Sequence, residues 1–390
     1  MDGKQPDEAS VLRQRFERML VECVSRDASD IHLTPGNKPY FRVHGRVSAA
    51  EDFHALTGEE LKELSELLLG SRDRAPLESN GAIDGALSAA DGTRYRYNIF
   101  RCQSLLSIAL RRLEDEFRSL DQLGLPNNLY ELCNFSDGLV ILAGPTGSGK
   151  STTLATLLHR INEMRHGHIV TIEDPIEYIH KPRNCLVNQR EIGKDAATFN
   201  AALVSAMRQD PDVILVGEIR DLNTIRTAIT AAETGHLVLT TVHASDCVGT
   251  IERLVSVFPA NEQEGIRRQL SLVLKAIVNQ HLIVSDGVQK KIVIGGEPIR
   301  RRRVVCSEIL RMNAAVAHLI AAGKSAQIYS TMETHRSIGM QTLEQDLARL
   351  WTTGAISEAS AVALSKSPKI LRDRVAHLKK PRRSLRLEGH

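Results

Sequence analysis

The residues best suited to chemistry form one glycine-rich run in the middle of the 390-residue chain. The run consists of Gly144, Pro145, Thr146, Gly147, Ser148, Gly149, Lys150, Ser151 and Thr152. It fits G-x-x-x-x-G-K-[ST], and the flanking apolar segments predict a strand before it and a helix after it. In such a loop Lys150 reaches the β- and γ-phosphates and Ser151 binds Mg²⁺. The motif predicts an ATP and Mg²⁺ site, with a glycine turn that binds nothing as the alternative.

An acid for the metal lies at the end of a second apolar run. Residues 213–216 predict a buried strand, and Gly217 and Glu218 follow it directly. Nucleotide-binding sites often place an aspartate here, but this chain has Gly217 at that position. We therefore expect Glu218 to serve the Mg²⁺ ion, partly through a coordinated water.

Three more acids follow the predicted strand at 168–172, within five residues of one another. They are Glu173, Asp174 and Glu177. The carboxyl ends of strands in a parallel sheet face the ligand, so we expect this segment to supply the carboxylate that activates water. A solvated acidic turn is the alternative.

Two histidines bracket the predicted strand at 237–242. His243 lies at the carboxyl end, where we expect a contact with the γ-phosphate. His236 lies at the amino end and is a further site candidate. A structural role is the alternative for both.

The pattern of elements divides the chain into four parts. Residues 1–116 read as a small α/β domain, 117–133 as a linker, 134–365 as βαβ units on a mainly parallel sheet with helices on both faces, and 366–390 as a basic tail. Within the third part we expect an apolar helix at 266–279, a polar excursion at 287–303 and a strand at 304–309.

Composition limits the class of protein. The 50 basic and 47 acidic residues nearly balance, although the tail from Lys366 carries nine Lys/Arg and two Asp/Glu. Six scattered cysteines without a C-x-x-C pair indicate reduced thiols rather than disulfides or a zinc site. No run of about 18 apolar residues occurs. We expect a cytoplasmic protein that reaches the inner membrane through partners.

These motifs together resemble the secretion ATPases of type II and type IV machines, and among them the PilT-like branch. The resemblance rests on residues 28–33, 144–152, 173–178, 187–191, 207–218 and 234–243. It implies a RecA-like P-loop ATPase core behind a PAS-like N-terminal domain, working as a homohexamer. It also implies that Glu177 is the catalytic base and that Arg96 and Arg111 reach the nucleotide.

Several departures distinguish the chain within that superfamily. It has no tetracysteine insert, unlike the extension and export ATPases. Residues 315–322 keep the apolar skeleton of the retraction signature Ala-Ile-Arg-Asn-Leu-Ile-Arg-Glu but lose both arginines. Four arginines at 300–303 are extra, as are the tail residues Lys379, Lys380, Arg382, Arg383 and Arg386. These features resemble the DotB/TraJ-like ATPases of type IVB secretion and conjugation.

The leading prediction is a hexameric, Mg-ATP-hydrolysing motor docked on the cytoplasmic components of a type IVB secretion or conjugation complex. A type IV pilus retraction motor is the alternative within the same class. A RecA-like nucleic-acid translocase, held to DNA by the basic tail, is the alternative from another class. A structural subunit that binds ATP without hydrolysing it is a third. The tail is also a candidate contact for an acidic surface.

Overall fold

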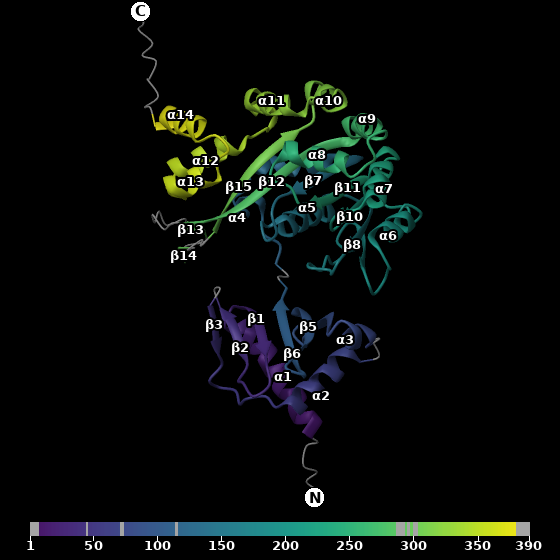
Figure 1. Cartoon of the computed structure of the whole chain (residues 1–390), viewed down its shortest axis with the longest axis vertical. Coiled ribbons are helices and arrows are strands. Elements are labelled where there is room, and N and C mark those ends of the chain that lie inside the picture. The colour runs from purple at the N-terminus through teal and green to yellow at the C-terminus, as the bar shows by residue number, and fades with distance from the viewer. Residues whose placement is uncertain are drawn as a thin grey trace, which may run out of the picture. The chain divides into compact units, whose positions relative to one another are not determined.

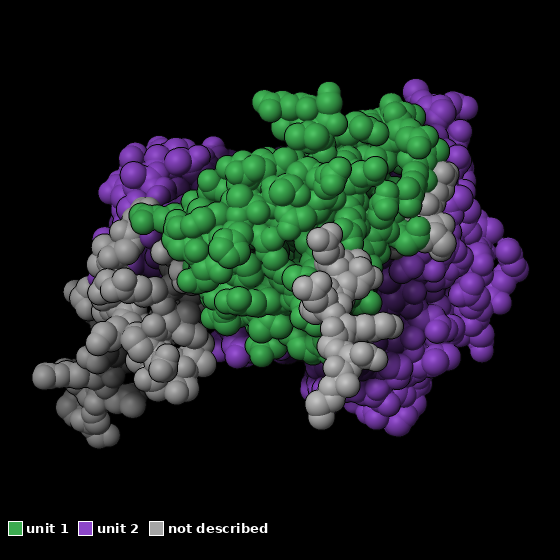
Figure 2. Space-filling model, turned by 90° about the horizontal axis from the view of Figure 1, so that it is seen from below, with its two compact units in different colours: residues 1–116, 177–179 green, residues 117–176, 180–390 purple. Residues whose placement is uncertain are grey.

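The computed structural model describes residues 8–43, 46–70, 74–113, 116–285, 293–294, 297–298 and 303–379. The chain forms two compact units (Figures 1 and 2). Unit 1 contains Met1–Glu116 and Glu177–Ile179, and unit 2 contains Phe117–Ile176 and His180–His390. Separate hydrophobic clusters fill the two units.

Unit 1 is built on an antiparallel six-stranded sheet in the order β3-β2-β1-β6-β5-β4. Its strands are β1 (Ala28–Leu33), β2 (Tyr40–Val43), β3 (Arg46–Ala49), β4 (Ala82–Ser88), β5 (Arg94–Cys102) and β6 (Leu105–Arg112). Its helices are α1 (Glu8–Ser25), α2 (Gly58–Leu69) and α3 (Ala75–Ser79). Apolar side chains of α1 and α2 pack with those of the sheet in a single core.

Side chains along β5 alternate between the buried core and the opposite face of the sheet. Tyr95 and Tyr97 are buried, and their hydroxyls donate to Leu20 O at 2.7 Å and to Leu68 O at 2.8 Å. These bonds join the strand to α1 and α2. Because successive side chains of a strand point to opposite faces, Arg96 lies on the face turned away from the core.

Unit 2 is built on a seven-stranded sheet in the order β15-β12-β7-β11-β10-β8-β9, parallel except for β15. Its strands are β7 (Gly138–Ala143), β8 (His168–Glu173), β9 (Leu186–Glu191), β10 (Val213–Val216), β11 (Leu237–Val242), β12 (Leu274–Val284) and β15 (Arg303–Arg311), and β13 (Val293–Ile294) pairs separately with β14 (Glu297–Pro298). Its longer helices are α5 (Lys150–Met164), α6 (Phe199–Ala206), α7 (Leu222–Glu233), α8 (Cys247–Ser256), α9 (Gln263–Val273), α10 (Ala314–Ala321), α12 (Leu343–Thr352) and α14 (Pro368–Lys379). Shorter helical segments are α4 (Leu120–Leu123), η1 (Asn127–Asn134), η2 (Ser325–Gln327), α11 (Ile328–Thr334), η3 (Arg336–Ile338) and α13 (Glu358–Leu364).

Helices cover both faces of this sheet (Figure 1). Along β7, Leu139 and Ile141 pack in a cluster with α6, α7, α8 and α9. Val140 and Leu142 point the other way and pack with α5 and η1. Strands buried on both faces are continuous apolar runs, as the sequence shows. The predicted α/β class, with a mainly parallel sheet, helices on both faces and a smaller N-terminal α/β part, is confirmed.

The predicted helix at 266–279 is wrong in its second half. α9 ends at Val273, and β12 begins at Leu274. β12 is hydrogen-bonded on one side to β7 and on the other to β15, which places it inside the sheet. A short apolar run fits a buried helix and a buried strand equally well, and the free edge of β7 decides for the strand.

Two segments expected to be peripheral are packed into unit 2. The predicted linker at 117–133 forms α4 and η1, whose Leu120, Leu129 and Leu132 are buried under the sheet. The predicted tail contains α14, whose Leu371 and Val375 are buried beside α12. Residues 300–302, together with Lys380, Arg382, Arg383 and Arg386, lie outside the described residues.

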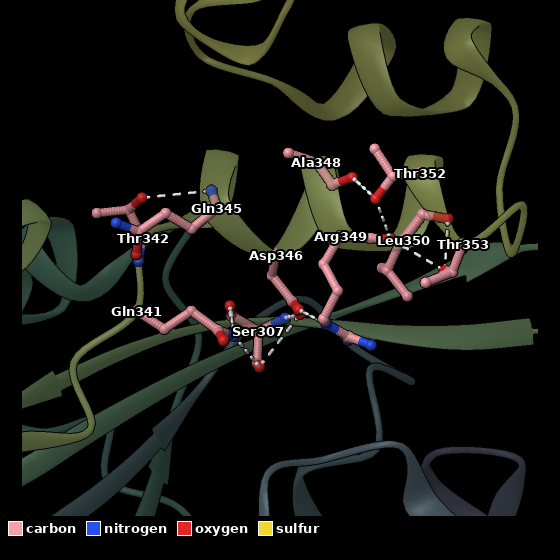
Figure 3. A network of polar contacts seen from close by, with 10 residues as sticks. All are labelled: Ser307, Gln341, Thr342, Gln345, Asp346, Ala348, Arg349, Leu350, Thr352 and Thr353. Atoms are coloured by element: carbon pink, nitrogen blue, oxygen red, sulfur yellow. Dashed lines mark hydrogen bonds and ion pairs between the residues drawn. The ribbon is translucent and has the colours of Figure 1, made fainter. Parts of the chain in front are cut away.

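The C-terminal helices are joined to the sheet by a buried polar network (Figure 3). Asp346 of α12 accepts the N–H of Ser307 on β15 at 2.8 Å and pairs with Arg349 at 2.7 Å. Gln341 donates to Ser307 O at 2.9 Å. Direct polar contacts therefore attach α12 to β15.

The cysteines differ in their exposure to solvent. Cys23, Cys133, Cys185, Cys247 and Cys306 are buried and free, and Cys102 is exposed and free. Burial raises the pKa of the Cys133 thiol to about 12, so it stays protonated. None of the described helices is long and apolar enough to cross a membrane.

Candidate active site

The glycine-rich run joins β7 to α5, as predicted. Gly144 has φ of 139°, and a Cβ on it would collide with the backbone oxygen of Gln280. Gly149, with φ of 89°, is the N-cap of α5, where no side chain caps the helix. The first turn of α5 thus begins directly at the loop, where the positive end of the helix attracts an anion such as a phosphate.

Polar side chains within this loop fit a phosphate chain. Lys150 is only 8% exposed, and its Nζ donates to Gly144 O at 3.0 Å and to Pro145 O at 2.9 Å. Among the described side chains, Ser148 carries a buried hydroxyl without a hydrogen-bond partner. A buried cation and an unsatisfied hydroxyl in one loop match the charge and the acceptor oxygens of a triphosphate.

Few protein side chains near the loop could bind a metal ion. Ser151 lies exposed in the first turn of α5, next to Lys150. No group of three His, Cys, Asp or Glu residues in the described ranges could hold a metal ion.

Gln280 of β12 supports the loop and was missed in the sequence. Its Nε2 donates to the hydroxyl of Thr153 in α5 at 3.0 Å, and its backbone lies against Gly144. The sequence predicted a helix ending just before this residue, so nothing placed it beside the loop. The useful signal was the β-branched pair Ile277 and Val278, which favours a strand.

Glu218 and His243 meet at the carboxyl edge of two neighbouring strands. Glu218 follows β10 and His243 follows β11, and His243 Nε2 lies 3.7 Å from Glu218 Oε2. Arg220 pairs with the same carboxylate oxygen at 2.6 Å, a partner that the sequence did not predict. Thr241 of β11 donates to Gly217 O at 2.6 Å, so the ends of the two strands are also in contact.

The electrostatic environment of His243 links it to the phosphate loop. Partial burial lowers the pKa of His243, and the positive charge of Lys150 lowers it further, against the opposing charge of Glu218. The imidazole is therefore neutral at neutral pH and can form hydrogen bonds with a phosphate without adding charge.

The three acids after β8 have different surroundings. Glu173 ends the strand, and its Oε1 accepts from Thr171 at 2.6 Å and from Gln189 of β9 at 3.1 Å. Asp174 is exposed and precedes a cis peptide bond to Pro175. Glu177 is exposed and belongs to unit 1. Glu173 is thus engaged at the sheet edge, whereas Asp174 and Glu177 present their carboxylates to solvent.

His236 does not lie with the other candidates at the carboxyl edge of the sheet, and its role as a site residue stays a prediction. It precedes β11, and its Nδ1 lies 2.9 Å from Ala231 O at the end of α7. The six residues of β11 span about 20 Å between His236 and His243. His236 therefore joins α7 to the sheet at the edge opposite the phosphate loop.

Arg96 and Arg111 lie side by side in unit 1. They are cross-strand partners in the pairing of β5 with β6. Arg111 Nε pairs with the buried Asp30 at 2.9 Å, and Arg96 lies 3.7 Å from Asp84. Arg42 also approaches Asp30, at 3.4 Å. Asp30, in the segment 28–33 singled out by the sequence, thus orients Arg111.

We expect Arg111→Ala to lower the ATP hydrolysis rate about 10- to 100-fold, the value of one hydrogen bond to a charged group. The fold should persist, because the guanidinium is mostly exposed and the core lies on the other face of the sheet. Steady-state hydrolysis by the full chain measures the effect, with Arg13→Ala on the exposed face of α1 as the matched control. Equal rates for the two variants would contradict the role of Arg111.

A family of known proteins matches most of the chain. The type II/IV secretion system protein family matches residues 4–359. The chain belongs to this family. Its match extends over both units and includes every candidate residue of the site.

Relatives within the family narrow the comparison. The chain is 40% identical to the type IV pilus retraction ATPase PilT of Pseudomonas aeruginosa over 350 residues, which cover 90% of this chain and 98% of the relative. A crystal structure of the pilus retraction motor PilT with bound ADP has a TM-score of 0.83 and 40% identity, covering 92% of this chain and 98% of that one. The Legionella pneumophila ATPase DotB has a TM-score of 0.75 and 28% identity, covering 90% and 94%.

These comparisons change which of the two predicted machines is better supported. The chain is an ATPase of the type II/IV secretion family. The similarity to PilT exceeds the similarity to DotB in both identity and TM-score. The predicted alternative, pilus retraction, is therefore better supported than type IVB secretion or conjugation.

Proposed function

We propose that the protein is a hexameric motor that hydrolyses Mg-ATP to retract a type IV pilus, working on the cytoplasmic side of the inner membrane. The observation that carries this proposal is the 40% identity to a retraction ATPase across nearly the full length of both chains. Units 1 and 2 are both included in this match. The proposal replaces type IVB secretion and conjugation as the leading interpretation.

The departure at residues 315–322 concerns the surface of α10 and not its packing. Val316 and Ile320, which keep the apolar skeleton, are fully buried. Ala317 and Ala321, which stand where the retraction signature has arginines, are only partly buried. The substitutions therefore alter what α10 presents to a neighbour, while the helix itself remains in place. This is the feature that still favours a DotB-like machine as a second candidate.

Each candidate residue has a defined part in the proposed reaction. Lys150 and the N–H groups of the loop hold the triphosphate, and Glu177 accepts a proton from the attacking water. Ser151 and Glu218 would hold Mg²⁺, partly through water, and the ion would neutralise phosphate charge. His243 would form a neutral hydrogen bond with the γ-phosphate.

Arginines from unit 1 complete the proposed site. Arg96 and Arg111 would add positive charge where negative charge develops on the transferred phosphoryl group. Because they belong to a different unit from Lys150, hydrolysis would depend on the arrangement of the units. Such a dependence is what a motor needs to convert hydrolysis into movement.

The nucleic-acid translocase is less well supported. It rested on the basic tail, yet two of the tail lysines are engaged within unit 2. Lys366 pairs with Asp246 at 2.7 Å, and Lys379 Nζ lies 5.6 Å from the centre of the Trp351 ring. These two lysines therefore have partners within unit 2.

Deleting the gene in its own host tests the proposal against the second candidate. A retraction motor predicts cells that keep or accumulate surface pili and lose surface motility. Normal pilus numbers and motility, together with loss of protein secretion or conjugative transfer, would overturn the proposal. Complementation with the wild-type gene and with Lys150→Ala provides the control for ATP dependence.

A further inference from the structure

The chain from Ala244 to Cys247, the first residue of α8, is held at each residue by a side chain from elsewhere in unit 2. We call residues 244–247, which directly follow His243, the sensor loop. Asn279 donates to Ala244 O at 3.0 Å, His281 Nε2 lies 3.3 Å from Ser245 O, Lys366 pairs with Asp246 at 2.7 Å, and Glu308 accepts the N–H of Cys247 at 2.8 Å. These four contacts hold the chain that directly follows His243.

Three of the four contacts come from the sheet itself. Asn279 and His281 are on β12, and Glu308 is on β15. Asn279 and Glu308 are at most 1% exposed, so they form a fixed base for the sensor loop. The fourth, Lys366, lies between α13 and α14, in the C-terminal helical part.

Asp246 makes two contacts, one with each of its carboxylate oxygens. Oδ1 accepts the N–H of Gly249 as the N-cap of α8, and Oδ2 pairs with Lys366. Burial raises the pKa of this carboxyl, but the ammonium of Lys366 and the N–H of Gly249 outweigh burial, so its pKa lies below the usual value. Asp246 is therefore ionised at neutral pH, and the pair is charged.

Lys366 is itself fixed by the C-terminal helices. Its backbone N–H donates to Glu344 Oε1 at 3.1 Å. Glu344 lies fully buried in the first turn of α12, and the hydroxyl of Tyr329 in α11 donates to its other oxygen. A chain of direct contacts thus runs from α11 and α12 through Lys366 to Asp246 and the sensor loop.

We propose that Lys366 is a positioning residue for ATP hydrolysis: by holding Asp246 it sets the sensor loop, and hence His243, from the C-terminal helices. The proposal rests on the proposed contact of His243 with the γ-phosphate. It connects α11 and α12 to the nucleotide site through Lys366 and the sensor loop, and α12 is also attached to β15 through Asp346 (Figure 3).

A purely stabilising ion pair is the simpler interpretation, and it predicts different results. The side chain of Lys366 is 42% exposed, and ion pairs with that exposure contribute little to the stability of a fold. A misplaced catalytic group, in contrast, lowers the rate strongly without unfolding the protein. Rate and melting temperature therefore separate the two interpretations.

The test compares Lys366→Met and Asp246→Asn with Lys369→Met in the full-length chain. Methionine keeps the apolar stem without the charge, and asparagine retains the N-cap of α8. Lys369 is exposed at the start of α14 and serves as the matched control. We expect both test variants to lower kcat about 10- to 100-fold with KM for Mg-ATP within about twofold and an unchanged Tm. Lys366→Arg should restore most of the rate.

The double variant with His243→Ala decides whether the effect passes through His243. If it does, Lys366→Met will lower kcat no further in the His243→Ala background. An unchanged kcat in Lys366→Met, or additive losses in the double variant, would overturn the inference while leaving the proposed site intact. An unchanged kcat in His243→Ala would instead overturn the proposed role of His243, and the inference with it.

Discussion

Lys150→Ala should abolish ATP binding and hydrolysis together. The ammonium is buried in the loop and is held on Gly144 O and Pro145 O, where it would meet the β- and γ-phosphates. Loss of a charge-assisted contact in a buried site is not compensated by solvent. Titration with a fluorescent ATP analogue and a steady-state hydrolysis assay measure both effects.

Lys275→Ala is the matched control for Lys150→Ala. Lys275 lies at the start of β12 and pairs with Asp137 at 2.9 Å, at the amino edge of the sheet and away from the loop. This variant should bind and hydrolyse ATP normally. Hydrolysis at the wild-type rate by Lys150→Ala would mean that this loop is not the working site.

Glu177→Gln should bind Mg-ATP normally and hydrolyse it at least about 100-fold more slowly, the usual cost of removing a general base. Glutamine keeps the shape of the side chain but cannot accept the proton of the attacking water. Because Glu177 is exposed, the substitution should leave the melting temperature unchanged. Binding, rate and Tm measured on the same preparation test all three statements.

Glu218→Gln should behave differently, because its proposed role is with the metal. The neutral amide holds the water shell of Mg²⁺ less firmly, so the Mg²⁺ concentration needed for half-maximal rate should rise. The substitution also frees Arg220, now paired with Glu218 at 2.6 Å. If excess Mg²⁺ restored Glu177→Gln and left Glu218→Gln inactive, the two assigned roles would be reversed.

Local patterns predicted the parts of the site that are contiguous in sequence. The loop at 144–152, the strand before Glu218 and the strand before His243 all lie where their apolar runs placed them. A glycine run between a strand and a helix, or an acid after a strand, has the same local form in any parallel sheet. Such features need no knowledge of distant residues.

Contacts between distant segments could not be predicted in the same way. Gln280 reaches the loop because β12 pairs with β7, and that pairing depends on which edge of the sheet is open. Asp30 reaches Arg111 through the register of β1 with β6. Lys366 was predicted to be the first residue of a basic tail, because composition shows that a residue is charged but not which residue it pairs with.

The prediction of the machine was misdirected by weighting a few departures above the whole chain. Residues 315–322 and the basic tail suggested a DotB-like role, yet the first alters a partly exposed face of α10 and the second is partly folded into α14. Identity spread over 350 residues samples both units and the site together. Identity over the whole length is therefore a broader basis for predicting the function than a few local differences.

The measurement that tests the account most directly is the retraction of fluorescently labelled pili in living cells of the host. Cells with the wild-type protein should show extension followed by retraction. Cells in which Glu177→Gln replaces it at the same level should extend pili and fail to retract them. Retraction at the wild-type frequency and speed in cells with Glu177→Gln would contradict the account.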